Sequence, residues 1–269
     1  MSKEFSLAHL TVLGCPPPEM TYIAAMTGYD YVSIRPIYMG LPGEPNYDLA
    51  NNKEMLKQTK TALRETGLGV HDIELAKIEN GRNVKQYEPA IEVAAELGAK
   101  SVLSSIWTPD RNFYIEQFAE LCDIANKYGL NVDLEFVTWA SVFDLKGAAD
   151  VLKTVNKDNA GIMVDTLHFY RSKVKLEELD EIPREWFHFA HICDGPKEIP
   201  TDKESLIYTG RDARLYVGEG AIDIASILDK LPQDTVYSIE LPHIERVKEI
   251  GYAEHARRCL QTAKEYLAK

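Results

Sequence analysis

The sequence has few cysteines, and they are widely separated. They are Cys15, Cys122, Cys193 and Cys259, and no two of them form a Cys-x-x-Cys pair. This spacing argues against a zinc knuckle and gives no disulfide framework. We therefore expect reduced thiols, most of which pack in the core of a cytoplasmic protein.

Long apolar runs and an excess of positive charge are also missing. No stretch approaches the roughly 18 to 20 apolar residues that a membrane helix needs, and residues 1–10 carry charge without a signal-peptide run. The formal net charge of -12 argues against nucleic acid or an anionic membrane surface as the main partner. We expect a small-molecule substrate, with no nucleic-acid or membrane partner and with homo-oligomer formation left open.

No break in composition marks a linker, so residues 1–269 are predicted to form one domain. A chain of 269 residues is close to the usual size of one β/α barrel, although length alone would also fit two smaller domains. The order of the secondary structure elements must therefore decide the fold.

Short apolar runs alternate with longer amphipathic stretches along the whole chain. The strand-like runs are Ser6–Val12, Asp30–Arg35, Leu68–Glu74, Lys100–Ile106, Asn131–Val137, Gly161–Asp165, Phe187–Cys193 and Thr235–Leu241. The helix-like segments include Asn52–Thr66, Gln86–Leu97, Tyr114–Tyr128, Val142–Asn156, Ile222–Leu231 and Tyr252–Leu267. Glycine precedes four strands, at Gly28, Gly67, Gly98 and Gly129, as is typical of the position after a helix.

This alternation predicts the α/β class and a single (β/α)8 TIM barrel. No G-x-G-x-x-G follows the first strand, so a dinucleotide fold is not supported. Three long connections, Ile37–Asn51, Leu167–Leu176 and Gly195–Gly220, follow the C-terminal ends of strands. Barrel enzymes build their sites at this end.

Four consecutive strands end in residues that an apolar strand does not need, namely Glu135, Asp165, His191 and Glu240. Neighbouring strands lie about 4.8 Å apart, so one side chain from each can converge on a common point. Three carboxylates so close would repel one another unless a cation neutralised them. The set predicts one divalent metal, Mn²⁺ by preference, with Mg²⁺, Co²⁺ or Zn²⁺ as alternatives. A simpler interpretation, in which an acid only caps its strand or pairs with an arginine, is reasonable for one residue but not for four.

The motifs around these residues resemble those of a known superfamily. They are Leu134-Glu135-Phe136, Val164-Asp165-Thr166-Leu167-His168, His191-Ile192-Cys193-Asp194, Gly218-Glu219-Gly220 followed by Ile222-Asp223, and Ser238-Ile239-Glu240. In their order and spacing the chain resembles the xylose isomerase-like TIM barrels, which include ketose 3-epimerases, inosose isomerases and dehydratases, and sugar phosphate isomerases.

The resemblance implies roles for individual residues. It implies that Glu135, Asp165, His191 and Glu240 are the metal ligands, and that the two glutamates also act as the acid/base pair. His168 matches a histidine that contacts a substrate oxygen, and Lys197 stands where the epimerases place a substrate-binding arginine.

The chain also departs from the pattern of these relatives. Ser141 stands where the epimerases have a further glutamate, and Cys193-Asp194 replaces a common Lys-Asp pair. The second strand ends in Arg35 where many relatives have an acid. These differences leave the substrate open, but they do not affect the metal ligands.

Other residues predicted at the same end of the barrel are candidates for binding substrate. His9 is expected on the first strand, Arg35 and Glu74 at the ends of the second and third, and Trp107 and Trp139 just after the fourth and fifth. Arg211 and Arg214 precede the Gly-Glu-Gly motif and would reach substrate or a partner subunit. The alternatives are packing for the tryptophans and ordinary ion pairs for the arginines.

The leading functional hypothesis is an isomerase or epimerase of a keto-sugar, inosose or related polyol. A metal would stabilise the enediolate formed when Glu135 or Glu240 removes a proton, and the other glutamate would return one. The main alternative is a lyase, like the inosose or dehydroshikimate dehydratases, in which the same first step is followed by β-elimination. A DNA-repair nuclease of the same superfamily is disfavoured by the seven histidines and the acidic charge. A non-enzymatic barrel would have little need for this ligand set.

Overall fold

Eight parallel strands pair in sequence order and close on themselves as a barrel. In the computed structural model, which describes residues 3–40 and 43–269, they are β1 (Phe5–Ala8), β2 (Tyr31–Ile34), β3 (Gly69–Ile78), β4 (Ser101–Ile106), β5 (Asn131–Glu135), β6 (Ala160–Asp165), β7 (Phe187–Ile192) and β8 (Val236–Ile239). The predicted (β/α)8 barrel is therefore confirmed. Residues 1 and 2 of the predicted domain, and 41 and 42 of the predicted connection Ile37–Asn51, lie outside the described residues.

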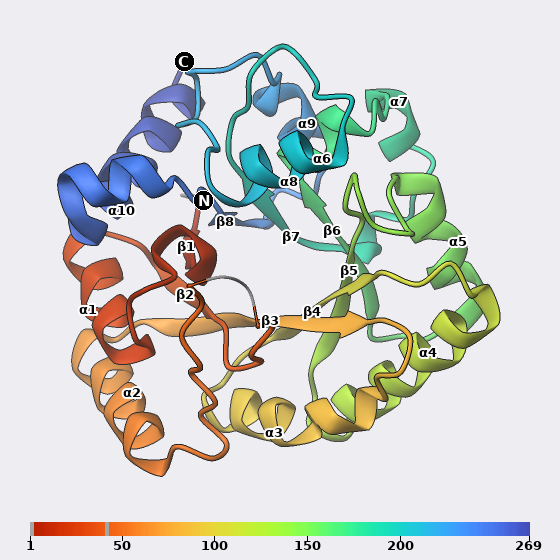
Figure 1. Ribbon diagram of the computed structural model, residues 1–269, viewed down its shortest axis with the longest axis horizontal. Coiled ribbons are helices and arrows are strands. Elements are labelled where there is room, and N and C mark those ends of the chain that lie inside the picture. Colours follow the sequence, from red (N-terminus) through yellow and green to blue (C-terminus); the bar gives the residue numbers. More distant parts are fainter. Residues whose placement is uncertain (1–2, 41–42) are drawn as a thin grey trace.

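Helices surround this barrel (Figure 1). They are η1 (His9–Val12), α1 (Pro17–Thr27), α2 (Lys53–Thr66), η2 (Val84–Tyr87), α3 (Glu88–Glu96), α4 (Arg111–Lys127), α5 (Leu145–Val155), α6 (Thr166–Arg171), α7 (Leu176–Leu179), η3 (Arg184–Trp186), α8 (Lys203–Arg211), α9 (Ile224–Lys230) and α10 (Ile244–Leu267). Within the described chain, none of them combines the length and apolar character needed to cross a membrane.

Local sequence signals fix the ends of the helices. The Asn52 side chain accepts a hydrogen bond from the backbone N–H of Met55 at the start of α2, and Asp110 accepts one from Phe113 in α4. Such N-caps satisfy donors that the helix itself leaves free. All four glycines expected after helices have positive φ, for example 75° at Gly67. The predicted helix–glycine–strand pattern is therefore confirmed.

Two layers of apolar side chains form the core. The larger layer lies between the strands and the surrounding helices. A smaller cluster consists of Leu75, Leu103, Met163, Phe189 and Val236. These residues come from five different strands, so they meet inside the barrel. They fill its interior below the C-terminal ends of the strands and leave those ends free for a site.

The structure corrects three details of the sequence prediction. β1 ends at Ala8 and the chain turns into η1, so His9 does not lie on the first strand. β3 continues to Ile78, so Glu74 lies within the strand and does not end it. The predicted connections Leu167–Leu176 and Gly195–Gly220 contain α6 and α8, because short helices can form there without a long amphipathic pattern.

Candidate metal centre

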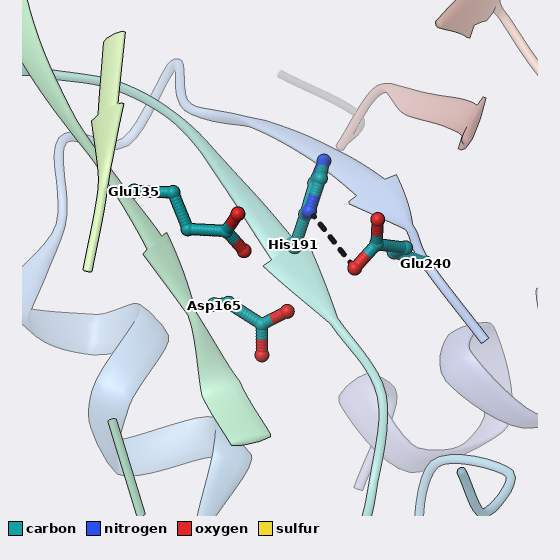
Figure 2. Close-up of side chains that lie close together, drawn as sticks. All are labelled: Glu135, Asp165, His191 and Glu240. Carbon is teal, nitrogen blue, oxygen red and sulfur yellow. Dashed lines mark ion pairs between the residues drawn. The ribbon is translucent and has the colours of Figure 1, made fainter. Parts of the chain in front are cut away.

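Four neighbouring strands bring Glu135, Asp165, His191 and Glu240 together at their C-terminal ends (Figure 2). Glu135 and Asp165 are the last residues of β5 and β6, and Glu240 directly follows β8. Asp165 pairs with His191 in the register of β6 and β7, so these two lie side by side. Donor atoms of all four lie within 4.8 Å of one another, and all four residues are buried.

Arg214 is the main positive charge in contact with these carboxylates. Its Nη1 lies 2.6 Å from Asp165 Oδ2, and its Nη2 lies 2.7 Å from Glu240 Oε2. Burial opposes the charged forms of both carboxyls, but the charge of Arg214 holds the pKa of each below its usual value. Arg214 therefore keeps two of the three ligand carboxylates ionised.

At Glu135 the positive charges nearby do not produce a net lowering of the pKa. Burial, followed by the nearby charges of Glu240 and Asp165, raises its pKa well above the usual value. His168 Nε2 lies 4.0 Å from Glu135 Oε1, but burial lowers the pKa of His168 to about 4, so this ring is neutral and adds no positive charge. The cluster therefore has more carboxylate charge than its own arginine balances.

The donor set fits a divalent cation. Both ring nitrogens of His191 are buried and make no hydrogen bond within the described part of the chain; Nδ1 lies 3.4 Å from Glu240 Oε2 without hydrogen-bond geometry. A buried imidazole without partners is costly unless another group binds it. Carboxylate oxygens and one imidazole nitrogen suit Mn²⁺, Mg²⁺, Co²⁺ or Zn²⁺. Glu135, Asp165, His191 and Glu240 would hold such an ion, whose charge would offset that of the carboxylates.

Asp165 also positions a neighbouring helix. Its Oδ1 accepts hydrogen bonds from the backbone N–H groups of Leu167 and His168 at 2.7 and 3.2 Å, which caps α6. The backbone N–H of Thr138 donates to Nδ1 of His168 at 3.4 Å, so the proton of this neutral ring lies on Nε2. His168 is thereby fixed as a hydrogen-bond donor beside Glu135.

A pocket lies above the candidate metal centre. It is lined by Leu10, Arg35, Met39, Leu75, Trp107, Glu135, Val137, Trp139, His168, Gly210, Arg211, Arg214 and Glu240. Six of the residues predicted to reach substrate line it, namely Arg35, Trp107, Trp139, His168, Arg211 and Arg214. The candidate ligands Asp165 and His191 lie beneath this lining and are fully buried.

Glu74 acts through Arg35 and does not line the pocket. Arg35 donates to Glu74 Oε2 through Nε and Nη2, at 3.1 and 2.8 Å. Burial raises the pKa of Glu74 to about 7, although the charge of Arg35 opposes this. Asp72 Oδ2 and Glu74 Oε1 are buried and have no hydrogen-bond partner among residues 3–40 and 43–269, and both residues lie near His191. Asp72 and Glu74 therefore form a second pair of buried acids beside the candidate metal centre.

The structure does not bring His9 and Lys197 into this pocket. The ring nitrogens of His9 contact the backbone: Nε2 lies 2.8 Å from the Cys15 oxygen, and Nδ1 accepts from the Arg35 N–H. Lys197 is exposed, and its carbonyl accepts a hydrogen bond from Tyr170. The spacing after His191 suggested Lys197, but the connection carries that residue to the surface.

Sequence reasoning missed Thr138 and the apolar pocket residues Leu10, Met39 and Val137. Thr138 matters because its N–H fixes the tautomer of His168. Its position, three residues after Glu135, was the only available signal. The apolar residues gave none, because an apolar residue near the end of a strand usually belongs to the core.

The fold and the four converging side chains define a β/α barrel with a candidate metal centre at the C-terminal ends of its strands. The chain belongs to the family of xylose isomerase-like TIM barrels, whose model matches residues 22–263.

Characterised relatives of this chain include an isomerase and a dehydratase. It is 26% identical over 253 residues to an inosose isomerase of Bacillus velezensis, a match that covers 88% of this chain and 86% of the relative. It is 23% identical over 236 residues to a 3-dehydroshikimate dehydratase of Pseudomonas aeruginosa, covering 83% of this chain and 35% of that protein. A crystal structure of the IolI protein with a bound zinc atom superposes with a TM-score of 0.82 at 20% identity, covering 98% of both chains.

Proposed function

We propose that the protein is a divalent-metal-dependent isomerase or epimerase of a keto-sugar, inosose or related polyol. The observation that carries this proposal is the convergence of Glu135, Asp165, His191 and Glu240 under a pocket that both glutamates line. Similarity to an inosose isomerase supports the substrate class. The buried free cysteines suit the cytoplasm as its compartment.

The two glutamates are proposed as the acid/base pair. Glu135 ends β5 and Glu240 follows β8, so they approach a bound substrate from different sides of the barrel opening. One carboxylate removes a proton from the carbon beside the carbonyl, and the other carboxyl delivers a proton to the resulting enediolate. A bound divalent cation would supply the positive charge that makes this C–H acidic. Mn²⁺ is the proposed ion, and the zinc in the IolI structure makes Zn²⁺ the first alternative.

Other pocket residues hold the substrate in this proposal. His168 presents a neutral Nε2–H donor beside Glu135, which suits a substrate oxygen. Trp107 and Trp139 form apolar walls, against which a sugar or cyclitol ring can stack while water is excluded. Arg35, held by Glu74, offers its remaining N–H groups to substrate oxygens.

A lyase is the second candidate function. The dehydratase relative supports it, and the Nε2–H of His168 could donate to a leaving oxygen. Both reactions begin with the same proton removal, and they differ in whether a proton is added to carbon or a β-substituent is expelled.

Reaction in D₂O with mass detection tests both candidates. An inosose and a set of ketohexoses would be incubated with Mn²⁺-loaded protein. We expect products of unchanged formula that carry solvent deuterium at the reacting carbon. Glu135→Gln and Glu240→Gln should each reduce turnover by on the order of 10²-fold or more, because each keeps the shape but loses a basic carboxylate. A product lighter by one water would select the lyase, and full activity of both variants would contradict the two-glutamate mechanism.

A further inference from the structure

Three arginines line the pocket, and carboxylates hold two of them. Arg35 is bound to Glu74, and Arg214 is bound to Asp165 and Glu240. Both arginines are almost completely buried. Their charges therefore serve mainly to balance acidic groups of the protein itself.

Arg211, the third arginine, differs in its partners. It is the last residue of α8, lines the same pocket and is partly buried. Among the described residues, no carboxylate lies within 4.0 Å of its guanidinium, and no hydrogen bond from this side chain is present. Asp212, Glu44 and Glu240 act on it without an ion pair, and burial followed by the charge of Arg35 gives it a net lowered pKa. Its positive charge is thus less compensated than those of Arg35 and Arg214.

The end of α8 is held firmly over the pocket. Arg171 donates to the Leu206 carbonyl at 3.2 Å and to Thr209 Oγ1 at 2.6 Å. The packing is also close, since a Cβ at Gly210 would lie only 2.4 Å from the Trp139 ring. These contacts fix the backbone from which the Arg211 side chain extends.

A helix C-terminus favours a cation by itself, because the helix dipole places partial negative charge there. That effect explains an arginine at this position, but it does not require the guanidinium to line a pocket. The Arg211 guanidinium is only partly buried and lines the pocket, so its N–H groups face the space that a ligand would occupy. A ligand with negatively charged acceptors would form stronger, charge-assisted hydrogen bonds there than water does.

We infer that the substrate carries an anionic group, a carboxylate or a phosphate, which Arg211 binds at the mouth of the pocket. The guanidinium fork matches both groups through two parallel N–H···O bonds. This inference rests on the proposed function, because it assigns a substrate class to the same pocket. It narrows the proposed keto-sugars, inososes and related polyols to derivatives that bear a negative charge away from the reacting carbonyl, and the neutral inosose and ketohexoses of the D₂O experiment then report only the shared proton-removal chemistry.

A matched pair of cyclic ketones tests the inference. The probes are 3-oxocyclohexanecarboxylate and its neutral carboxamide, with binding to Mn²⁺-loaded protein measured by calorimetry. We expect the carboxylate to bind about tenfold more tightly than the amide, and added salt to reduce the difference. Arg211→Gln should abolish this preference, and Arg211→Lys should retain part of it. Lys203→Gln, which removes a positive charge at the exposed start of α8, is the matched control and should retain the full preference.

Inorganic phosphate distinguishes the two anion types. Competition with the carboxylate in the wild type but not in Arg211→Gln supports a phosphate-accepting site, and lack of competition narrows the class to carboxylates. Equal affinity for the carboxylate and the carboxamide probe overturns the inference. Failure of both probes to bind also overturns it, as does an unchanged preference for the carboxylate in Arg211→Gln.

A separate readout keeps the inference apart from the proposed function. Exchange of solvent deuterium at the carbons beside the probe ketone depends on Glu135 and reports the proton-removal step. Exchange without a charge preference contradicts only the anion site. A charge preference without exchange contradicts only the proposed isomerase or lyase.

Discussion

At the scale of single residues, Glu135 and His191 stand out because the pKa of each is raised. Burial and the neighbouring carboxylates raise the pKa of Glu135 well above its usual value. For His191, burial is the largest single effect and favours the neutral ring, but Glu240, Glu135 and Glu74 together outweigh it and raise the pKa to about 10. A metal ligand must be deprotonated. Metal uptake at neutral pH must therefore release protons from this site.

We accordingly predict that the affinity for Mn²⁺ rises with pH through the neutral range and towards pH 10. The sign follows because both raised pKa values make protons compete with the metal until the pH exceeds them. Calorimetry in buffers of different ionisation enthalpy measures the number of protons released. Asp165→Asn keeps an oxygen for the α6 cap but removes one charged ligand, so it should bind metal weakly at every pH. Metal binding that is independent of pH and releases no protons would contradict the assignment.

At the scale of elements, the connection between β7 and α9 depends on Asp194. Its carboxylate accepts hydrogen bonds from four backbone N–H groups, those of Gly195, Gly218, Gly220 and Ile222, at 2.8–3.1 Å. Asp194 and Leu215 also exchange backbone hydrogen bonds. Because Arg214 precedes Leu215, this network fixes the backbone that carries the arginine of the metal centre.

We predict that Asp194→Ala reduces the free energy of unfolding by about 3 kcal/mol, since it leaves two buried and two partly buried donors without a charged acceptor. Asp194→Asn should reduce the free energy of unfolding by less, because its side-chain carbonyl oxygen still accepts some of these hydrogen bonds. Urea unfolding followed by circular dichroism measures both effects. Asp223→Asn, which retains an exposed helix cap on α9, serves as the control and should change stability by only a few tenths of a kcal/mol. An Asp194→Ala protein as stable as this control would refute the role of the network.

At the scale of the whole molecule, His188 and Asp133 form an ion pair at the N-terminal end of the barrel, opposite the candidate metal centre. His188 Nδ1 is 2.7 Å from Asp133 Oδ1, and Ser101 donates to the other oxygen of Asp133. Gly161 makes room for the pair, since a Cβ there would lie 2.2 Å from Asp133 Oδ1. Burial lowers the pKa of His188, but the charge and hydrogen bond of Asp133 outweigh it and give a net raised pKa.

This pair predicts a dependence of stability on pH. Because the folded-state pKa of His188 is raised, its contribution is fully present below the unfolded value of about 6.5. The contribution is lost as pH rises through the folded-state pKa. The unfolding free energy of the wild type should therefore fall towards that of His188→Gln as pH increases above about 6.5. Urea titrations of both proteins over this range measure the difference, and two parallel curves would argue against the pair.

The sequence by itself determined the βα order, the eight-stranded barrel and the positions of the four candidate metal ligands. These features depend on local signals: apolar periodicity, glycine after helices, and acids or histidine at strand ends. Parallel strands in sequence order then place those ends side by side. Glu135, Asp165, His191 and Glu240 could therefore be grouped before any coordinates were known.

Only the tertiary structure decided which other side chains meet these four. Arg214 is 49 residues from Asp165 in the sequence, and Arg35 is 39 from Glu74, yet both pairs are in contact. The turn after β1 directs His9 to the backbone, and the connection after β7 carries Lys197 to the surface. Such contacts depend on how the chain leaves each strand and on how the closed barrel orients the loops. Neither the path of the chain after each strand nor the orientation of the loops is encoded in a local pattern, because both result from packing between segments far apart in the chain.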